Sequence, residues 1–211
     1  MIVWSLRAFE NNAGIRSVVV TTSPENDQDI QNVVRSANLS KIRSFVTGGD
    51  SRSKSVLNAL KVLEDRQPDF VAVHDGSRPL LTQTIISDGL HKVEIHAAAI
   101  PAVPAIDTVK IVDHDRRIVQ SPPRSTVWHA QTPQFARYSD MLKAHLALAD
   151  SLDRFTDDAS LLATSGIPIQ IYQGDRGNLK ITTIEDLVAV RTIVTHRHDE
   201  SPTITKIERK T

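Results

Sequence analysis

Opposite charges and a glycine follow directly on a short apolar run in the first half of the chain. Residues 71–73 are Val, Ala and Val, and after them come His74, Asp75, Gly76 and Arg78. A buried strand that stops in such residues places an approachable backbone and both charges at the carboxyl edge of a sheet, where open α/β proteins bind ligands. The carboxylate could face a divalent cation or sugar hydroxyls, and the guanidinium could steady the loop. The alternative is a structural ion pair at the end of a strand.

A glycine pair opens the second candidate segment, residues 48–55, which read Gly-Gly-Asp-Ser-Arg-Ser-Lys-Ser. The segment follows a predicted strand and begins a predicted helix. Free backbone N–H groups, the positive end of the helix and two basic residues therefore converge on one point, which favours an anion or the polar edge of a ring. A glycine turn with Ser51 as the helix N-cap is the alternative.

Two later segments add further candidate residues. Lys180 lies inside an otherwise apolar and β-branched run. Burying a lysine there is costly without an anion nearby, which favours a functional role. Thr156 precedes Asp157, Asp158 and an apolar helix, an order that is typical of an N-cap with acidic residues in the first turn.

The composition restricts the possible partners and chemistry. The chain has 211 residues, 25 basic and 25 acidic side chains, and no cysteine. This length fits one domain with a real core. Balanced charge gives no global attraction to nucleic acid or an anionic membrane, and the lack of cysteine excludes disulfides and thiolate chemistry. No apolar run approaches the roughly 20 residues that cross a bilayer, and no secretory leader is recognisable, so we expect a soluble, cytoplasmic protein.

Short apolar runs alternate with segments of helical periodicity. The predicted strands are residues 15–22, 42–46, 70–74, 97–103 and 167–172. The predicted helices are residues 1–9, 27–37, 51–66, 84–95, 138–150, 157–164 and 184–194. Pro101 and Pro104 are expected to interrupt the fourth strand. The alternation predicts an α/β fold in which a mostly parallel sheet carries helices on both faces.

The alternation of strands and helices stops in the middle of the chain. Two β-type runs at residues 108–112 and 117–119 flank His114 and Asp115, which predicts a hairpin that projects from the sheet. The hairpin could be the handle of a dimer or a solvated excursion without a partner. At the other end of the chain, residues 196–211 are polar and are predicted to form a disordered tail.

Six motifs occur in one order along the chain and carry a family resemblance. They are Gly48-Gly49-Asp50-x-Arg52-x-x-Ser55-Val56, Val73-His74-Asp75-x-x-Arg78-Pro79, Asp107-Thr108-x-Lys110, Trp128-x-Ala130-Gln131-Thr132-Pro133-Gln134, Thr156-Asp157-Asp158-Ala159 and Gly177-Asn178-x-Lys180-Ile181-Thr182. This set closely resembles the 2-C-methyl-D-erythritol 4-phosphate cytidylyltransferases of the non-mevalonate isoprenoid pathway. The resemblance runs from about Met1 to Thr195.

The resemblance implies a Rossmann-like nucleotidyltransferase domain over residues 1–195 with a dimerisation arm at about residues 107–124. The implied reaction transfers CMP from CTP to methylerythritol phosphate, releases pyrophosphate and uses Mg²⁺ with Asp75 as its protein neighbour. Asp75 and Gly76 are implied to lie beside the ribose and the metal-bound phosphates. The residues implied to contact the cytidine are Gly49, Asp50 and Ser55.

The resemblance also implies a set of residues that hold the sugar phosphate. They are Arg78, Asp107, Thr108, Arg124, Thr132, Thr156 and Lys180. Arg124 and Thr132 are implied to reach the neighbouring subunit's site from the hairpin region, which makes the enzyme a homodimer. The implied catalytic residues are Arg124, Lys180 and Asp75. Because two polyanions must approach in line, catalysis is mostly positioning and neutralisation of charge, for which an arginine fork and a lysine point charge are suited.

One part of the family's pattern is not found in this sequence. The family begins with a strand, an Ala-Ala-Gly-x-Gly-x-Arg loop and a downstream lysine that hold the triphosphate, whereas residues 1–9 here are predicted to be a helix. Losing one preorganised donor of this type costs about 2.7–4 kcal/mol of transition-state stabilisation. We therefore expect an incompletely assigned reading frame or a nearly inactive chain. A cytidylyltransfer assay on this chain beside an N-terminally extended one tests that expectation.

Two other functions stay open at this point. A ribitol 5-phosphate cytidylyltransferase would share the fold and the CTP site, and a panel of both alcohol phosphates would separate the two enzymes. A catalytically inactive, dimeric sugar-phosphate-binding protein would bind the sugar phosphate without binding CTP, which calorimetry would detect.

Overall fold

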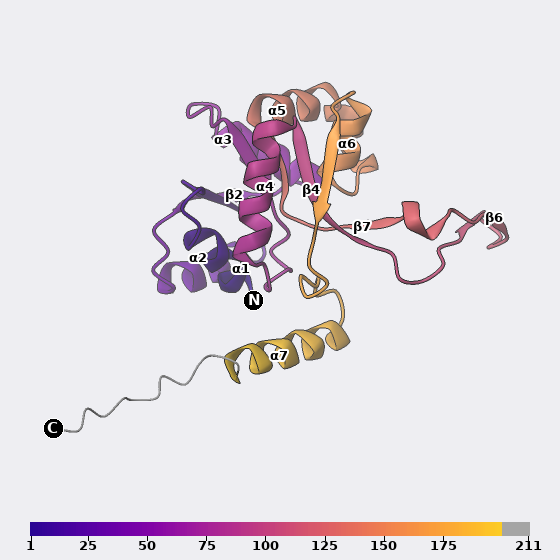
Figure 1. Ribbon diagram of the computed structural model, residues 1–211. Helices are drawn as coiled ribbons and strands as arrows, with labels where there is room; N and C mark the ends of the chain where they lie inside the picture. Colours follow the sequence, from indigo (N-terminus) through magenta and orange to yellow (C-terminus); the bar gives the residue numbers. More distant parts are fainter. Residues whose placement is uncertain (200–211) are drawn as a thin grey trace.

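The computed structural model describes residues 1–199, in which helices and strands alternate as the sequence predicts (Figure 1). The helices are α1 (Ile2–Glu10), α2 (Asp27–Ser36), α3 (Arg52–Val62), α4 (Gln83–Ile95), α5 (Tyr138–Ala147), α6 (Asp158–Thr164) and α7 (Ile184–Asp199), with the 3₁₀ helices η1 (Arg124–Thr126) and η2 (Ala149–Arg154). The strands are β1 (Val18–Thr22), β2 (Ile42–Thr47), β3 (Phe70–Val73), β4 (Ala98–Pro104), β5 (Ile111–Val112), β6 (Ile118–Gln120), β7 (Trp128–Ala130), β8 (Gln134–Arg137) and β9 (Ile169–Gln173).

The strands of the body form two sheets. The larger has the order β3-β8-β4-β7, with β9 pairing with β4 as well, and β1 pairs with β2 in a separate sheet. β1–β2 and β4–β9 are parallel, whereas β3–β8, β4–β8 and β4–β7 are antiparallel. The sequence predicts a mostly parallel sheet. The pairing is mixed because β7 and β8, two strands that sequence periodicity did not reveal, return antiparallel to β4.

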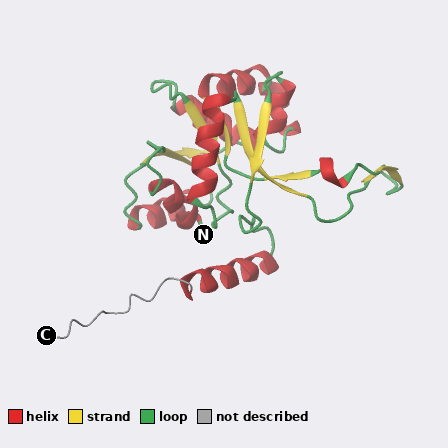
Figure 2. Ribbon diagram, in the orientation of Figure 1, coloured by secondary structure: helices red, strands yellow, loops and turns green. Residues whose placement is uncertain are grey.

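Helices cover both faces of the larger sheet, as predicted for the α/β class (Figure 2). Successive residues of a strand point to opposite faces. Ala98 and Ala136 accordingly pack with residues of α3, α5 and α6, whereas Ala99 and Phe135 pack with residues of α1 and α4. Two apolar cores thus hold the sheet between layers, so the loops at its edge start from rigid strands.

β4 runs through Pro101 without the predicted interruption. Pro101 lies between Ala99, where the pairing with β8 ends, and Ala102, where the pairing with β7 begins. Its carbonyl oxygen accepts a hydrogen bond of 2.8 Å from the backbone N–H of Gln131. Proline lacks an N–H group, and at this junction of two partner strands the missing donor breaks no ladder.

The predicted hairpin is present and projects from the body as an arm made of β5, β6 and their flanking segments (Figure 1). Its turn is organised by Asp113, whose Oδ1 accepts backbone hydrogen bonds from Asp115 and Arg117, both at 2.9 Å. The apolar side chains of both strands are between 45% and 62% exposed in the single chain: Ile111, Val112, Ile118 and Val119. The exposure of these side chains suits an interface with a second protein surface.

Helix α7 lies apart from the body and continues to Asp199 (Figure 1). Residues 196–199 of the expected tail are therefore helical, and residues 200–211 lie outside the described residues. Within the described part of the chain, none of the helices has both the length and the apolar character needed to cross a membrane.

Candidate active site

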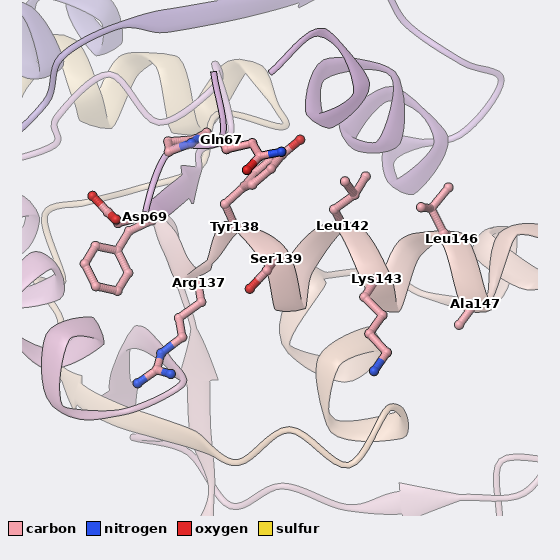
Figure 3. Close-up of a pocket in the computed structure, with 11 residues that line it drawn as sticks. Gln67, Asp69, Arg137, Tyr138, Ser139, Leu142, Lys143, Leu146 and Ala147 are labelled. Carbon is pink, nitrogen blue, oxygen red and sulfur yellow. The ribbon is translucent and has the colours of Figure 1, made fainter. Parts of the chain in front are cut away.

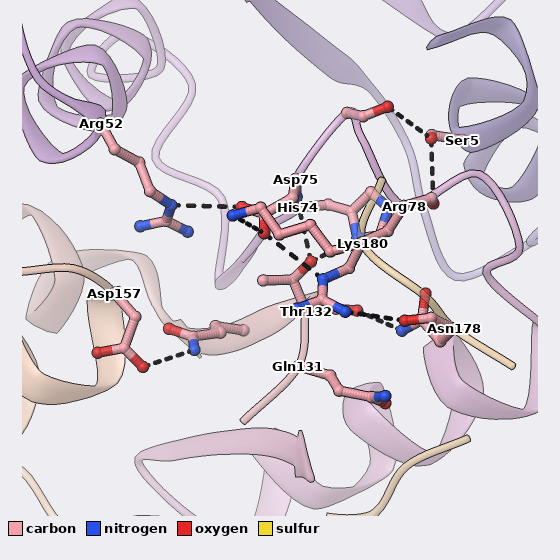
Figure 4. A network of polar contacts seen from close by, with 12 residues as sticks. Ser5, Arg52, His74, Asp75, Arg78, Gln131, Thr132, Asp157, Asn178 and Lys180 are labelled. Carbon is pink, nitrogen blue, oxygen red and sulfur yellow. Dashed lines mark hydrogen bonds and ion pairs between the residues drawn. The ribbon is translucent and has the colours of Figure 1, made fainter. Parts of the chain in front are cut away.

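Three loops from distant parts of the chain meet at one edge of the larger sheet (Figure 4). They are residues 74–78 after β3, residues 131–133 between β7 and β8, and residues 174–180 after β9. With the starts of α3 and α6, they enclose a pocket of about 240 Å³. The pocket is lined by Arg52, Asp75, Arg78, Ala130, Gln131, Thr132, Gln134, Thr156, Asp157 and Lys180.

Asp75 lies at the centre of three cations. Its Oδ1 is 3.3 Å from Arg52 Nε, and its Oδ2 is 3.5 Å from Arg78 Nε and 3.1 Å from Lys180 Nζ. Burial raises the pKa of the Asp75 carboxyl group, but the attraction of Arg52, Lys180 and Arg78 outweighs burial, so the pKa lies below its ordinary value. One ionised carboxylate faces three positive charges, and the surplus of positive charge suits an anionic ligand.

Arg52 joins the pocket to a buried carboxylate behind it. Arg52 Nη2 donates a 2.8 Å hydrogen bond to Asp158 Oδ2, and the Asp158 side chain is fully buried. The other carboxylate oxygen of Asp158 lies 3.6 Å from His145 Nε2, and His145 Nδ1 donates to the carbonyl of Met141 at 2.9 Å. Burial lowers the pKa of His145. Arg52 is therefore held from both sides by carboxylates, Asp75 in front and Asp158 behind.

His74 connects two of the loops. Its Nε2 donates to the carbonyl oxygen of Arg78 at 3.1 Å, and its Nδ1 lies 3.0 Å from the hydroxyl of Thr132. The same hydroxyl accepts the backbone N–H of Asp75 at 3.1 Å. Burial lowers the pKa of His74 from 6.5 to about 4, so the ring is neutral at physiological pH. The Phe9 ring packs edge-on against it, with 5.3 Å between ring centroids.

The neutral, buried state of His74 predicts that stability falls on acidification. Between pH 6.5 and about pH 4 the unfolded chain protonates this imidazole and the native chain does not, so the free energy of unfolding decreases as the pH falls through that window. The loss due to His74 is up to about 3 kcal/mol at the lower end. Urea unfolding of the unaltered chain and of His74→Gln at pH 7.5 and pH 4.5 measures it. The variant should show a shallower pH dependence, retaining the part due to His145; equal slopes contradict the assignment.

Buried amides fasten the third loop to the other two. Arg78 Nη1 donates to the carbonyl of Asn178 at 2.8 Å, and Asn178 Nδ2 donates to the carbonyl of Thr132 at 2.9 Å. Gln131 Nε2 donates to the carbonyl of Asp175 at 2.8 Å. Lys180 is carried at the end of this anchored loop with its side chain 45% exposed. The loop that carries Lys180 is thus anchored, while the side chain is open to solvent and free to turn.

The structure brings together four of the residues implied to hold the sugar phosphate, Arg78, Thr132, Thr156 and Lys180, and places Asp75 beside them. The cytidine set lies beside the pocket, at the end of β2 and the start of α3. There the backbone N–H of Gly49 donates to Ser55 Oγ at 3.0 Å, and Asp50 Oδ1 lies 3.0 Å from Lys54 Nζ. Gly76 belongs to the first loop, where its carbonyl oxygen accepts from Ser5 Oγ at 3.3 Å.

The other implied residues are not in this pocket. Asp107, Thr108 and Arg124 are exposed on the arm, and Arg124 Nη1 donates to the carbonyl of Ile106 at 3.1 Å. In contrast to the expectation, Thr132 does not extend toward a neighbouring subunit. Its side chain is buried in the pocket of its own chain, because its hydroxyl is bonded to Asp75 and His74.

Sequence reasoning missed several residues of the site. It counted Arg52 among the two basic residues of the glycine segment and named His74 at the end of a strand, but it gave neither an individual role, and it interpreted Asp158 as a residue of a helix first turn. His145 gave no signal, since a lone histidine on a helix has no partner in the local sequence. The sequence placed Asp157 in the first turn of the helix, after Thr156. In the structure Asp157 is itself the N-cap of α6, and its Oδ1 accepts from the backbone N–H of Ser160 at 3.0 Å.

A magnesium ion fits this pocket only with a limited contribution from the protein. Mg²⁺ in nucleotide enzymes is commonly held by one or two carboxylates together with phosphate oxygens. Asp75 offers one carboxylate, already paired with three cations, and the described residues contain no cluster of three or more His, Cys, Asp or Glu side chains. The donor set therefore suits a metal carried mainly by nucleotide phosphates, with Asp75 as its protein ligand.

A larger hollow lies away from these loops (Figure 3). Its volume is about 940 Å³, and it is lined by residues 67–70 at the start of β3 together with residues of α5 such as Leu142, Lys143 and Leu146. It is an open groove at the opposite end of β3 from Asp75. The convergent charges described above are absent from its lining, so the smaller pocket is the candidate active site.

Comparison with known proteins identifies the family of the chain. The family model of 2-C-methyl-D-erythritol 4-phosphate cytidylyltransferase matches residues 1–196. Enzymes of that name from Caldanaerobacter subterraneus and Geobacter metallireducens are 36% and 39% identical to the chain. These matches cover 89% and 90% of this chain and 83% of each relative.

Solved structures of such proteins superpose on most of the chain. The crystal structure of 4-diphosphocytidyl-2C-methyl-D-erythritol synthase from Anaerococcus prevotii matches with a TM-score of 0.84 at 26% identity, covering 92% of this chain and 85% of that one. The Francisella tularensis cytidylyltransferase matches with a TM-score of 0.78 at 31% identity, covering 91% and 87%. The chain therefore belongs to the 2-C-methyl-D-erythritol 4-phosphate cytidylyltransferase family and is a nucleotidyltransferase.

Proposed function

We propose that this chain transfers CMP from CTP to 2-C-methyl-D-erythritol 4-phosphate. In this reaction a phosphate oxygen of the sugar alcohol attacks the α-phosphorus of CTP, the bond between the α- and β-phosphates breaks, and pyrophosphate leaves. The observation that carries the proposal is the convergence of Arg52, Arg78 and Lys180 on Asp75 in a small pocket. Such a site neutralises charge without supplying a nucleophile of its own, as phosphoryl transfer requires.

Lys180 is the residue we assign to the attacking phosphate. Its side chain is the most exposed of the three cationic side chains around Asp75 and lies at the end of an anchored loop. A phosphate in the pocket would compete with Asp75 for this ammonium group. Arg52 and Arg78 are held by Asp158 and by the carbonyl of Asn178, respectively, so they stay in place as Lys180 turns to the phosphate.

Gly49, Asp50 and Ser55 are the residues that we assign to the cytidine, with Gly76 beside the ribose. Arg52 lies within the same segment, at the start of α3, and also lines the pocket, so the proposed nucleotide and sugar-phosphate sites adjoin. Asp75 is the residue that would hold Mg²⁺, which supplies neutralising charge to the pyrophosphate leaving group when bound.

The arm supports a dimer in which Arg124 acts on the partner's site. Arg124, Asp107 and Thr108 are exposed and lie outside the pocket of their own chain, and the arm carries exposed apolar side chains on β5 and β6. A guanidinium at this position suits a second contact to the attacking phosphate, because its planar fork binds two phosphate oxygens at once. We assign Thr132, in contrast, to the site of its own chain.

Phosphorus NMR of the chain with CTP, MgCl₂ and either methylerythritol 4-phosphate or ribitol 5-phosphate tests the proposal. Only with the methylerythritol substrate do we expect signals of a CDP-alcohol and of pyrophosphate, and we expect them to appear slowly because the family's Ala-Ala-Gly-x-Gly-x-Arg loop is not found in this sequence. Turnover only with ribitol 5-phosphate overturns the substrate assignment. Calorimetric binding of methylerythritol 4-phosphate without CTP binding or turnover overturns the assignment as an enzyme in favour of a sugar-phosphate-binding protein.

A further inference from the structure

The groups around the Thr132 hydroxyl determine which hydrogen bond it donates and which it accepts. His74 Nε2 lies 3.1 Å from the carbonyl oxygen of Arg78, and a carbonyl can only accept, so Nε2 carries the imidazole proton. In a neutral ring the other nitrogen, Nδ1, is then an acceptor. The Thr132 hydroxyl at 3.0 Å must donate its single proton to Nδ1.

The hydrogen bonds that the hydroxyl can still accept follow from its number of lone pairs. A hydroxyl oxygen has one proton and two lone pairs. One lone pair accepts the backbone N–H of Asp75 at 3.1 Å, so one lone pair remains on the oxygen of a side chain that lines the pocket. We infer that His74 is a positioning residue that turns Thr132 into a hydrogen-bond acceptor, so that Thr132 recognises a hydroxyl group of the substrate and not its phosphate.

This inference rests on the proposed function and adds an orientation to it. A phosphate oxygen is an acceptor and would meet the lone pair of Thr132 unfavourably, whereas a polyol hydroxyl would donate to it. Lys180 Nζ lies 3.1 Å from the carboxylate oxygen Oδ2 of Asp75, whereas the Thr132 hydroxyl is bonded to the backbone N–H of that residue. The phosphate end of the substrate is thereby directed to Lys180 and the polyol end to Thr132.

The network that holds Thr132 leaves its side chain little freedom to reverse this arrangement. Its carbonyl oxygen accepts from Asn178 Nδ2 at 2.9 Å, and the side chain is 4% exposed. The His74 ring packs edge-on against Phe9, and each of its nitrogens lies within hydrogen-bond distance of a protein group. The surrounding fold therefore sets the direction of the Thr132 proton.

The first test determines which nitrogen of the His74 ring carries the proton, in the unaltered full chain. Long-range ¹H–¹⁵N correlation spectra of the imidazoles, assigned by the signal that His74→Gln removes, distinguish the two tautomers. We expect the form protonated at Nε2, unchanged from pH 8 to pH 6. A ring protonated at Nδ1, or a ring that titrates in that range, overturns the inference. Because this measurement needs no substrate, its outcome can be distinguished from a failure of the proposed function.

The second test uses calorimetry with inorganic phosphate, methylerythritol 4-phosphate and its monodeoxy analogues. Thr132→Val keeps the shape of the side chain, and we expect about tenfold weaker binding of methylerythritol 4-phosphate with no change for inorganic phosphate. One deoxy analogue should bind about tenfold more weakly to the unaltered chain, with no further loss in the variant. A loss of inorganic phosphate binding, or equal effects of Thr132→Val on every analogue, overturns the inference.

Two variants at His74 separate positioning from a loss of structure. His74→Phe keeps an aromatic ring against Phe9 but has no acceptor for the Thr132 proton. His74→Gln offers one donor and one acceptor. We expect His74→Phe to abolish the discrimination between methylerythritol 4-phosphate and that one deoxy analogue, and His74→Gln to retain most of it, at similar melting temperatures. Equal discrimination in both variants contradicts the role of His74.

Discussion

Replacing Lys180 by alanine should weaken the binding of methylerythritol 4-phosphate by about 10- to 100-fold and lower the turnover by about 10²- to 10³-fold. The reason is that the variant removes the cation that can leave Asp75 for the phosphate, while Arg52 and Arg78 stay fixed by other partners. The affinity for CTP should stay the same, because the proposed cytidine contacts lie at the end of β2. Calorimetry with each substrate and a pyrophosphate-release assay measure these effects.

Lys143→Ala is the matched control, since Lys143 lines the groove at the other end of the sheet. It should change neither affinity nor turnover. Because Lys180 is 45% exposed, its removal should leave the melting temperature nearly unchanged. An unaltered affinity for methylerythritol 4-phosphate in Lys180→Ala would remove this residue from the proposed site.

Arg124→Ala should reduce turnover to a similar degree and provides a test of the dimer. In a mixed dimer of Lys180→Ala and Arg124→Ala chains, one of the two sites contains both native residues. Random mixing should therefore restore about a quarter of the native activity, since about half of the dimers are mixed. No recovery after mixing through a denatured state contradicts the assignment of Arg124 to the partner's site.

Replacing the buried Asp158 by alanine should lower the free energy of unfolding by about 3 kcal/mol or more. Asp158 is fully buried and accepts from Arg52 at 2.8 Å, so its loss leaves a largely buried guanidinium with Asp75 as its remaining carboxylate partner. Urea denaturation followed by circular dichroism measures the change. Arg52 would also lose its fixed position in the pocket, so the variant should bind methylerythritol 4-phosphate more weakly.

Asp157→Ala is the neighbouring control. Asp157 caps α6 and accepts from Gln134 at 2.9 Å, and the loss of a helix cap costs about 0.5–2 kcal/mol. The two adjacent substitutions should therefore differ clearly in unfolding free energy. Equal costs would show that the pairing of Arg52 with Asp158 contributes no more than a cap.

The sequence predicts the elements that carry their own periodicity. The strand that ends at His74, the helix after Gly49 and the projecting hairpin all lie close to their expected positions because apolar spacing and turn residues are local signals. β7 and β8 were missed since they have three and four residues and are too short to show a pattern. Their pairing with β4 depends on tertiary contacts that no local pattern contains.

The residues of the candidate site also divide into those with a local sequence signal and those without one. Asp75, Arg78 and Lys180 are predictable because each is an unusual charge beside a strand. Arg52 and His145 owe their role to Asp158, which is 106 residues from Arg52 in the sequence. Thr132 shows most clearly what the sequence cannot predict. Its motif indicates a site residue, but only its hydrogen bonds to His74 and Asp75 place it in the pocket of its own chain.

The most direct test of the proposed site is a crystal structure of the chain with methylerythritol 4-phosphate bound. We expect the phosphate on Lys180 and on Arg124 of a second copy, and a polyol hydroxyl on Thr132, in the pocket beside Asp75. A ligand seated in the groove of α5, or a phosphate bound to Thr132 and remote from Lys180, would contradict it.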